Sequence, residues 1–577
     1  MPDTALASTR WIEPPPLPEE LIDHLSRSLR IPPELCRILV RRGLRDIDAV
    51  RSHLRPRLTS LHPAERLPDV AAAVWRIESA LAAGEKILVH GDYDADGMCA
   101  AGLLARGLAG LGADVEAFVP HRARDGYDLS EPGLGRAEEI GATLIVTADC
   151  GIVAHDAIAR AAAAGRDVVV TDHHRPGERL PDAVAVVNPN RRDGDYPFRG
   201  LAGVGVAFKL LSALYRRAGK GEGELNQHLD LVAIGTVADQ VPLLDENRVL
   251  VRAGLRVLGR TRKPGLRALL ERAGLADAAE LGAEHVAFVI APRLNSVGRM
   301  GAAEDGLCLL LTEDSAEATR LAGRLEEENS RRRAEDRDVL RAALALLPHR
   351  YDETRHRAVV LWGDGWHPGV IGIAASRLAQ RLHRPAIVVT FDGDVGRGSG
   401  RSFGGFHLFN ALRECEPLLE RYGGHRTAAG LTIRRARMED FAARLLDVAA
   451  RELDPALLVE ELEIDLELPL RSVTPELHRW LAHLGPFGAG SPAPLLLVRA
   501  ARLERPAGVG SDSKHLRVVL ASDEGARVRA IGFGLGGRLG EVASGGRWDV
   551  AFELAADRWQ GAPRFQARLR GLRRAVT

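Results

Sequence analysis

The feature that most constrains the fold is an alternation, between residues 70 and 190, of short apolar runs with helix-length segments rich in alanine, leucine and glycine. Successive parallel strands need a long crossover, usually a helix, so this alternation predicts a parallel sheet with helices on both faces. The expected strands are KILVH (86–90), DVEAFVP (114–120), TLIVTAD (143–149) and DVVVTD (167–172).

Acidic and imidazole side chains stand where three of these runs end. In an open parallel sheet, ligands bind at the carboxyl ends of the strands, so we expect these side chains to meet on one rim. Asp239, near the end of an apolar segment expected to be helical, is a further candidate. The strand-end side chains are Asp92, Asp94 and Asp96 after the first run, Asp149 after the third, and Asp172, His173 and His174 after the fourth.

The stretch HGDYDADGM (90–98) also has the spacing that opens an EF-hand calcium loop. Such a loop needs a bidentate Glu at position 12 and a helix before it. Counting from Asp92, position 12 is Leu103, which cannot bind a cation, and the preceding residues read as a buried strand. Calcium storage or sensing is therefore disfavoured, whereas a solvated acidic turn remains an alternative for this stretch taken alone.

The combined residue types favour a transition-metal or magnesium site. A single strand-end Asp usually caps a helix, and a single His-His pair usually lies in the core or on the surface. Their joint occurrence on successive strand ends is harder to obtain from turn chemistry. Carboxylates with imidazole suit Mn²⁺ or Mg²⁺, and the absence of thiolates from the set disfavours structural zinc. The ligands suffice for two ions, the usual device for hydrolysing phosphoesters.

Composition restricts the setting of the protein. The 577 residues have a formal net charge of zero, which gives no global signal for nucleic-acid binding. The five cysteines are widely spaced without a Cys-x-x-Cys pair, so neither a disulfide framework nor a zinc site is indicated. The N-terminus carries charges and prolines where a signal peptide needs an apolar core, and no membrane span is expected. A reducing cytoplasm is the predicted setting.

Further domains are expected downstream. Residues 314–347 are charged and lack helix breakers, which predicts a connecting helix, and a second α/β pattern begins near residue 357. From about residue 456, five short strand-like runs predict a small β-barrel of the OB kind. The first of these runs is LLVEELEIDLELPL (457–470), and the tail RFQARLRGLRRAVT is read only as a basic segment.

Four short motifs, DYDADG, TADCG, TDHH and GTVADQVPL, resemble in order and spacing the motifs of the DHH phosphoesterase superfamily, and RYGGHRTAAG (421–430) resembles the Gly-Gly-His motif of its DHHA1 domain. Longer stretches, such as VPHRARDGYDL and APRLNSVGRMG, are similar to the bacterial single-strand-specific exonucleases of that superfamily. The resemblance covers about residues 70–500. It implies an α/β chain divided into an N-terminal extension (1–69), a parallel-sheet DHH domain with a helical part (70–313), a connecting helix (314–350), a smaller α/β DHHA1 domain (351–455) and an OB-type barrel that binds DNA (456–577).

The resemblance also implies roles for individual residues. His174 would contact the scissile phosphate or assist its departure, Asp172 would orient a histidine, and Asp149 would bridge two ions. His90 is an additional candidate ligand, and the role of Asp92 stays open. The implied metal ligands are Asp94, Asp96, Asp149, His173 and Asp239.

Substrate contacts are expected mainly from arginines and from the second α/β region. Arg122, Arg293 and Arg299 are candidates for backbone phosphates. The stretch GSGRS (398–402), with Ser399 and Arg401, is expected to form a turn whose free N–H groups hold a terminal phosphate, the alternative being a glycine-rich hairpin. His425 is expected to contact a phosphate or the strand.

The implied function is 5′→3′ hydrolysis of single-stranded DNA with two Mn²⁺ or Mg²⁺ ions, in DNA repair and recombination, by a monomer. The neutral charge leaves open whether the chain binds DNA strongly alone or needs a single-strand-binding protein or a helicase. Two alternatives remain at this point. One is a small-substrate DHH enzyme, such as an oligoribonuclease, a nucleotide phosphatase or a cyclic-dinucleotide phosphodiesterase. The other is a catalytically silent DNA-binding scaffold.

Overall fold

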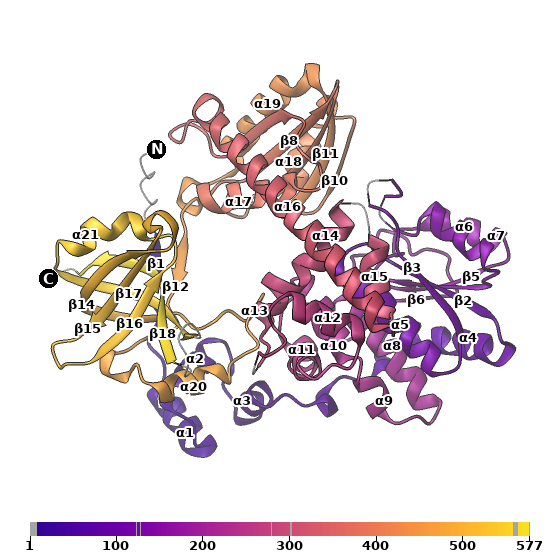
Figure 1. The fold of residues 1–577 in the computed structure, drawn as a ribbon, viewed down its shortest axis with the longest axis horizontal. Coiled ribbons are helices and arrows are strands. Elements are labelled where there is room, and N and C mark those ends of the chain that lie inside the picture. Colours follow the sequence, from indigo (N-terminus) through magenta and orange to yellow (C-terminus); the bar gives the residue numbers. More distant parts are fainter. Residues whose placement is uncertain are drawn as a thin grey trace. The chain divides into compact units, whose positions relative to one another are not determined.

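The computed structural model describes residues 9–575 except 123, 127, 279, 301–302 and 558–563 (Figure 1). The chain separates into two compact units, each with its own cores. The first unit comprises Pro56–Glu335 together with Pro486–Pro492, and the second comprises the other described residues. Within the described part of the chain, no helix is long and apolar enough to cross a membrane.

The first unit contains the predicted parallel sheet. Its five strands run in the order β3-β2-β4-β5-β6, and every neighbouring pair is parallel. All four predicted strands end within a few residues of the expected positions. The short fifth strand was not predicted, because three residues are too few to give a pattern. The strands are β2 (Lys86–Gly91), β3 (Asp114–Phe118), β4 (Leu144–Ala148), β5 (Asp167–Thr171) and β6 (Ala185–Val187).

Both faces of this sheet are buried, which explains the continuous apolar runs. Alternate strand residues enter different cores: Val89 and Val146 pack in one, Leu88 and Ile145 in the other. Each such side chain contributes about 1.5–3 kcal/mol when fully buried. The first core is covered by α4 (Val70–Ala83), α5 (Ala95–Gly110) and α8 (Gly203–Arg217), and the second by α6 (Glu131–Glu139) and α7 (His155–Ala163).

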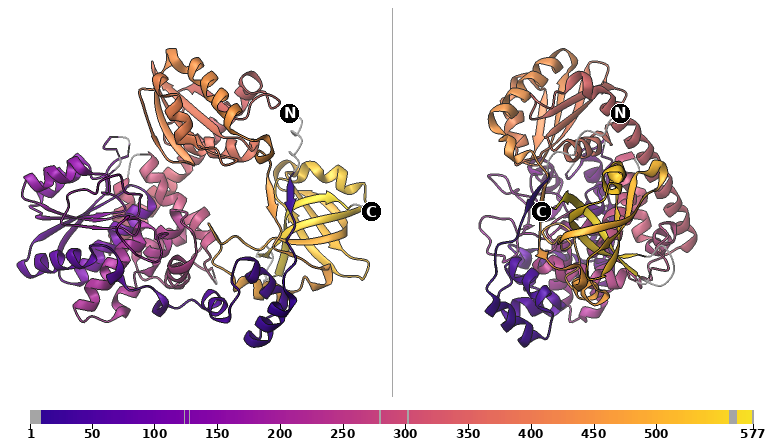
Figure 2. Two further views of the ribbon diagram at one scale, coloured as in Figure 1. Left: turned by 180° about the vertical axis from the view of Figure 1, so that it is seen from behind. Right: turned by 90° about the vertical axis from the view of Figure 1, so that its left-hand side faces the viewer.

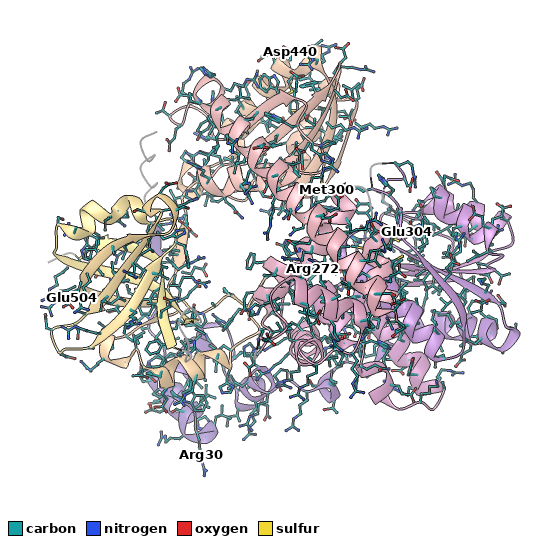
Figure 3. All side chains as sticks on the ribbon, viewed as in Figure 1. Arg30, Arg272, Met300, Glu304, Asp440 and Glu504 are labelled. Atoms are coloured by element: carbon teal, nitrogen blue, oxygen red, sulfur yellow. The ribbon has the colours of Figure 1, made fainter. Side chains whose placement is uncertain are left out.

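The rest of the first unit is helical, as expected. The predicted connecting helix is α16 (Ser315–Arg350), whose 36 residues run from the first unit into the second. The segment before α14 is a π-helical turn, η3 (Val286–Ile290), which is continuous with α14. The helices are α9 (Glu222–Asn226), α10 (Leu229–Ala238), α11 (Asp245–Leu258), α12 (Pro264–Arg272), α13 (Ala283–His285), α14 (Ala291–Met300) and α15 (Ala303–Leu311); Arg272, Met300 and Glu304 are labelled in Figure 3.

The second unit holds a mixed five-stranded sheet in the order β10-β11-β9-β8-β7, in which only β7 and β8 are parallel. One face packs against α18 and α19, and the other against α17 and the end of α16. These elements are β7 (Val359–Asp364), α17 (Ile371–Leu382), β8 (Ala386–Asp392), β9 (Val395–Arg401), α18 (Leu408–Glu414), β10 (Arg421–Gly424), β11 (Ala428–Arg434) and α19 (Met438–Glu452).

The expectation of a free GSGRS turn is wrong, because residues 395–401 form the central strand β9. Ser399 lies in register with Val388 on one side and with Gly430 on the other. Its glycines make room for large neighbours: a Cβ atom at Gly398 would lie 2.8 Å from Leu431, and one at Gly400 would lie 2.7 Å from Leu408. The backbone N–H groups of this strand are therefore used in the sheet.

The C-terminal barrel has five strands, visible from two further sides in Figure 2. The order is β14-β15-β16-β18-β17, and pairing of β14 with β17 closes the barrel. The sequence predicted the barrel, but it wrongly counted residues 457–470 as a barrel strand and did not assign the basic tail to any strand. Residues 457–470 form two short strands beside the barrel, and the basic tail supplies β18. The strands are β14 (Leu496–Val509), β15 (His515–Ala521), β16 (Arg527–Gly532), β17 (Arg547–Asp557) and β18 (Arg564–Arg574), with α20 (Pro475–Ala482) before them and α21 (Leu539–Ala543) between β16 and β17.

The N-terminal residues belong to the second unit. β1 (Arg10–Ile12) pairs in parallel with β12 (Glu461–Glu463), and β13 (Leu466–Glu467) pairs with β14. Trp11 packs under the guanidinium of Arg573, 4.4 Å from the ring centre. The helices that follow are α1 (Glu19–Leu29), α2 (Pro33–Arg41) and α3 (Ile47–Leu54).

Candidate metal centre

The predicted strand ends lie side by side because β2, β4 and β5 are consecutive in the sheet. Backbone hydrogen bonds hold each turn against the next strand: the N–H of Asp92 donates to the carbonyl of Ala148 (3.2 Å), and that of Asp149 donates to the carbonyl of Thr171 (3.0 Å). The first residues after three strands are therefore fixed on one rim, as predicted.

The aspartates after β2 are positioned by two helix N-termini. Asp94 is the N-cap of α5, and its Oδ1 accepts the N–H groups of Asp96 (2.9 Å) and Gly97 (3.1 Å). Asp96 is buried in the first turn of α5, where its carboxylate accepts the N–H groups of Gly203 (2.7 Å) and Val204 (3.1 Å) at the start of α8. Helix N-termini stabilise nearby negative charge, so both carboxylates are held in place.

Asp149 stands in the left-handed backbone region, with φ of 65°. This conformation is strained for a residue with a side chain, and such strain persists where surrounding contacts enforce it. The side chain is buried, and its Oδ1 lies 3.1 Å from His173 Nε2 and 3.9 Å from His174 Nδ1. His173 Nε2 also lies 3.6 Å from Asp239 Oδ2, at the C-terminal end of α10. Asp149 thus stands between the strand-end acids and the two histidines.

Asp172 holds the histidine pair. Its buried carboxylate accepts the backbone N–H groups of His173 (2.7 Å) and His174 (2.9 Å), and its Oδ2 accepts that of Ile152 (3.0 Å). Its Oδ1 also lies 2.8 Å from His174 Nδ1. Three of these contacts fix the turn after β5, and the contact with Ile152 ties that turn to the segment after β4.

Three overlapping groups of side chains could each hold a cation. In each group, one ligand atom per residue lies within 4.8 Å of the others. Three buried atoms among them have no hydrogen-bond partner: Asp92 Oδ1, Asp149 Oδ1 and His173 Nε2. Asp149 Oδ1 and His173 Nε2 are close, but their geometry is not that of a hydrogen bond. The groups are Asp92 with Asp94 and Asp149; Asp96 with His173 and Asp239; and Asp149 with His173 and His174.

These unpartnered atoms fit bound divalent cations. A buried polar atom without a partner costs about 1–3 kcal/mol, and more when charged. A cation placed among carboxylate oxygens and an imidazole nitrogen removes that cost. The donor set of four or more carboxylates and one or two imidazoles is the set that Mn²⁺ and Mg²⁺ accept.

Proton affinities in the site are strongly shifted. Burial, followed by the charges of neighbouring aspartates, raises the pKa of Asp96 and of Asp149 well above the ordinary value, and burial with Asp94 raises the pKa of Asp239 to about 7. Burial lowers the pKa of His173 to about 4, so its ring is neutral. His173 hydrogen-bonds the Leu201 backbone, which leaves Nε2 as the nitrogen facing the carboxylates.

His174 is shifted in the opposite direction. Burial alone would lower its pKa, but the hydrogen bond and the charge of Asp172 outweigh burial and raise the pKa to about 9. His174 therefore carries a positive charge at neutral pH. A neutral and a charged imidazole stand next to each other, with ring centres 4.5 Å apart.

Helix α8 approaches Asp149 so closely at Gly203 that there is no room for a side chain at this position. A Cβ atom there would collide with Asp149 Oδ1 and would lie 2.5 Å from Asp149 Cβ. We expect Gly203→Ala to displace Asp149 and to weaken Mn²⁺ binding about 10- to 100-fold in titration calorimetry. The matched control is Gly205→Ala on the same helix, where the nearest atom would be 3.3 Å away. Equal Mn²⁺ affinity in both variants would contradict this packing.

His90 lies apart from the three groups. It is fully buried, its Nε2 lies 3.1 Å from Ser130 Oγ, and its Nδ1 lies 3.8 Å from Cys150 Sγ. No group found among the described residues includes it. Its assignment as a ligand remains a prediction.

The three candidate phosphate arginines occupy different environments. Arg122 lies 5.3 Å from the ring centre of Tyr93, and Arg122 and Arg299 both lower the pKa of that tyrosine, so both stand near the loop after β2. Arg293 is buried, where its Nε pairs with Glu326 (2.6 Å) and its Nη1 donates to the carbonyl of Val289 (2.6 Å). Its surroundings indicate a structural role.

The other predicted substrate residues lie in the second unit. Arg401 Nη1 donates to Ser399 Oγ (3.1 Å), and both side chains stand at the N-terminus of α17, where a Cβ atom at Gly372 would lie 2.9 Å from Ser399 Oγ. His425 is exposed in the hairpin between β10 and β11, and its backbone N–H donates to the carbonyl of Ala428 (2.8 Å).

Several contributors were not predicted. Asp92, whose role the sequence left open, joins a cation group. Asp128, at φ of 81°, accepts the N–H of Gly151 (2.6 Å) and so fixes the turn that carries Asp149. Asn190 donates to the carbonyl of His173 (2.6 Å), and Asn295 on α14 accepts the N–H of Ala95 (2.9 Å). Asn and Asp are common in loops, so the sequence alone does not distinguish these supporting residues from ordinary loop residues. Only their contacts in the folded chain do.

A parallel sheet whose strand ends bring together this set of aspartates and histidines defines a DHH-type phosphoesterase. The DHH family N-terminal domain matches residues 86–236, the DHHA1 domain residues 356–451, and the RecJ OB domain residues 464–571.

Known relatives narrow the class. The chain is 36% identical over 545 residues to the single-stranded-DNA-specific exonuclease RecJ of Bacillus subtilis, covering 94% of this chain and 68% of that protein. Crystal structures of Thermus thermophilus RecJ are similar too: the Mn²⁺ complex has a TM-score of 0.84 at 35% identity, covering 99% of this chain and 80% of the other. The Mg²⁺ complex has a TM-score of 0.78 at 34% identity, covering 99% of this chain and 79% of the other. The chain belongs to the RecJ family of single-stranded-DNA-specific exonucleases.

Proposed function

We propose that this chain removes nucleotides from the 5′ end of single-stranded DNA by metal-dependent hydrolysis, in DNA repair and recombination. The observation that carries the proposal is the set of three overlapping cation groups, two of which include Asp149, with three buried ligand atoms that lack partners. Membership of a family of single-stranded-DNA-specific exonucleases supplies the substrate.

Two divalent ions, Mn²⁺ or Mg²⁺, fit the arrangement. Asp149 belongs to one group with Asp92 and Asp94 and to another with His173 and His174. His173 also belongs to the group with Asp96 and Asp239, so Asp149 would help to hold both ions. Two such ions, when bound, supply a water of lowered pKa and stabilise charge on the attacked phosphoryl group. The buried carboxylates hold their geometry through α5 and α8, so the site is preorganised.

His174 acts on the phosphate. Because its pKa is about 9, the ring carries a proton at neutral pH, and Asp172 fixes its Nδ1, which leaves Nε2 to donate to a phosphoryl oxygen. Asp172 is a positioning residue, because its fully buried carboxylate contacts only the turn after β5, His174 and the backbone of Ile152 among the hydrogen bonds described.

The 5′ end is recognised in the second unit. Ser399 and Arg401 share one hydrogen bond and stand at the N-terminus of α17, an environment that favours a terminal phosphate. Arg122 and Arg299, near the loop after β2, would contact strand phosphates, with His425 as a further contact. Arg293 is the exception among the proposed arginines, since both of its partners are internal.

The enzyme works in the cytoplasm as a monomer. With a net charge of zero, it has little long-range attraction for DNA, which favours delivery of the strand by a single-strand-binding protein or a helicase. A salt titration of DNA affinity measures how many phosphates the chain itself contacts.

The test is digestion of one oligonucleotide carrying a label at its 5′ or at its 3′ end, with Mn²⁺ present. We expect immediate release of the 5′ label as a mononucleotide and late release of the 3′ label, with duplex of the same sequence resisting attack. The proposal would be contradicted if the 3′ label were released before the 5′ label, or if duplex DNA were digested as fast as single-stranded DNA. Turnover confined to dinucleotides would instead favour a small-substrate DHH enzyme.

A further inference from the structure

Phe288 is the most exposed large apolar side chain among the described residues, with 75% of its surface open to solvent. It lies in the π-helical turn η3, between the fully buried side chains of Val286 and Ile290, which anchor the turn in the core. The ring therefore projects from a fixed base. π-Helical turns are rare and occur frequently at functional sites.

A buried arginine holds this turn. Arg293 donates to the carbonyl of Val289 (2.6 Å) and pairs through its Nε with Glu326 on α16 (2.6 Å). A π-helical turn perturbs the regular backbone hydrogen bonds of a helix, and a charged side chain satisfies the Val289 carbonyl here. A buried ion pair between Arg293 and Glu326 thus supports a turn whose central side chain faces solvent.

The same helical run reaches the metal centre. Phe288 and Arg299 are eleven positions apart, which is close to three turns of 3.6 residues, so the two side chains share one face of the run. Asn295, seven positions after Phe288, is on that face as well and binds the N–H of Ala95 at the start of α5. At about 1.5 Å per residue, Phe288 lies roughly 16 Å along this face from Arg299.

A flat, exposed aromatic side chain on this face suits the stacking of nucleic-acid bases. Bases of single-stranded nucleic acid stack on exposed aromatic rings without sequence preference, whereas paired bases are not available for such stacking. The ring lies about 10 Å along the helical run from Asn295, which contacts the start of α5 next to the metal loop. At that position it would stand beyond the reacting nucleotide, where the trailing part of a strand would lie.

We propose that Phe288 is a stacking platform for a base of the bound strand, a few nucleotides from the scissile phosphate, and that Arg293 positions it. This rests on the proposed exonuclease function. Phe288 would strengthen binding of unpaired DNA without touching the reacting atoms, so it contributes to KM and not to kcat.

The experiment measures release of the 5′-terminal nucleotide from an oligonucleotide and from versions with one abasic residue at successive positions. We expect Phe288→Ala to raise KM roughly 5- to 100-fold with unchanged kcat, and Phe288→Tyr to restore it. An abasic residue at the stacked position should raise KM for the wild-type chain but add little for Phe288→Ala. The matched control is Trp75→Ala, an aromatic on α4 that is 65% exposed.

An unchanged KM in Phe288→Ala would overturn the inference, and so would full additivity with every abasic position. A lower melting temperature with losses in kcat would show a structural role and would also overturn it. If the wild-type chain releases no 5′-terminal nucleotide, the proposed function fails; if it does and Phe288→Ala behaves identically, only this inference fails.

Discussion

Asp149→Asn lowers kcat/KM roughly 10³-fold or more, while the metal-free variant unfolds at the same temperature as the wild-type chain or at a higher one. The activity falls because the carboxylate shared by two cation groups is lost, and metal ions supply several kcal/mol of transition-state stabilisation. Stability does not fall, because burial and neighbouring carboxylates raise the pKa of Asp149, so its charged form opposes folding. Asn also tolerates the left-handed backbone at this position.

The sign of this stability effect follows from linkage. A carboxyl whose pKa is higher in the folded chain than in the unfolded one destabilises the folded state once the pH exceeds its unfolded pKa, about 3.9. The amide removes that penalty at neutral pH. Thermal denaturation in EDTA and in MnCl₂ measures both effects, with the exposed Asp182→Asn as control. Mn²⁺ should raise the melting temperature of the control and wild-type chains but much less that of Asp149→Asn.

If Asp149→Asn hydrolysed DNA at the wild-type rate, the assignment of Asp149 as a metal ligand would be wrong. A large drop in the melting temperature of its metal-free form would show instead that Asp149 is a structural residue whose charge is satisfied within the protein.

Asp172→Asn should be the more damaging change to folding. All four contacts of the buried carboxylate are to donors, and an amide replaces one acceptor oxygen by an NH₂ group that must face another donor. We expect a loss of about 2–4 kcal/mol in the free energy of unfolding and a 10- to 100-fold loss of activity. Urea denaturation measures the first, and the labelled-oligonucleotide assay the second.

The pH dependence separates the ion pair from the packing. The Asp172–His174 pair raises the folded pKa of His174 to about 9 from an ordinary value near 6.5. Stability from this pair is therefore fully present below about pH 6.5 and is lost as the pH rises through about 9. The stability difference between the wild-type chain and Asp172→Asn should shrink over that window. His174→Gln is the matched variant, because it should lose activity while Asp172 keeps its backbone contacts; equal destabilisation of both variants at all pH values would contradict the pairing.

Much of the fold was readable in the sequence because the first sheet is buried on both faces. Its strands are therefore continuous apolar runs separated by helices, and the acids follow them directly. The barrel strand β18 was missed for the opposite reason. Its inward residues, such as Ala567 and Leu569, alternate with outward arginines, and the charge hides the pattern of a strand. β9 was misread because its glycines, which suggest a turn, are required by neighbouring side chains.

The candidate site was predictable in its residue types but not in every role. Strand-end position identifies Asp149 and His173, whose neighbours in space are fixed by strand order. It cannot rank the aspartates after β2, because the use of Asp94 as a helix cap and the buried, unpartnered oxygen of Asp92 depend on side-chain geometry. Nor can it separate an arginine that binds DNA from Arg293, whose partner Glu326 lies 33 residues away on another helix.

The most direct test of the central claim is anomalous diffraction at the manganese edge from crystals of the protein grown with Mn²⁺. We predict two peaks separated by about 3.5–4 Å, one among Asp92, Asp94 and Asp149 and the other among Asp96, His173 and Asp239. A crystal with full occupancy at other side chains and none at Asp149 would contradict the account.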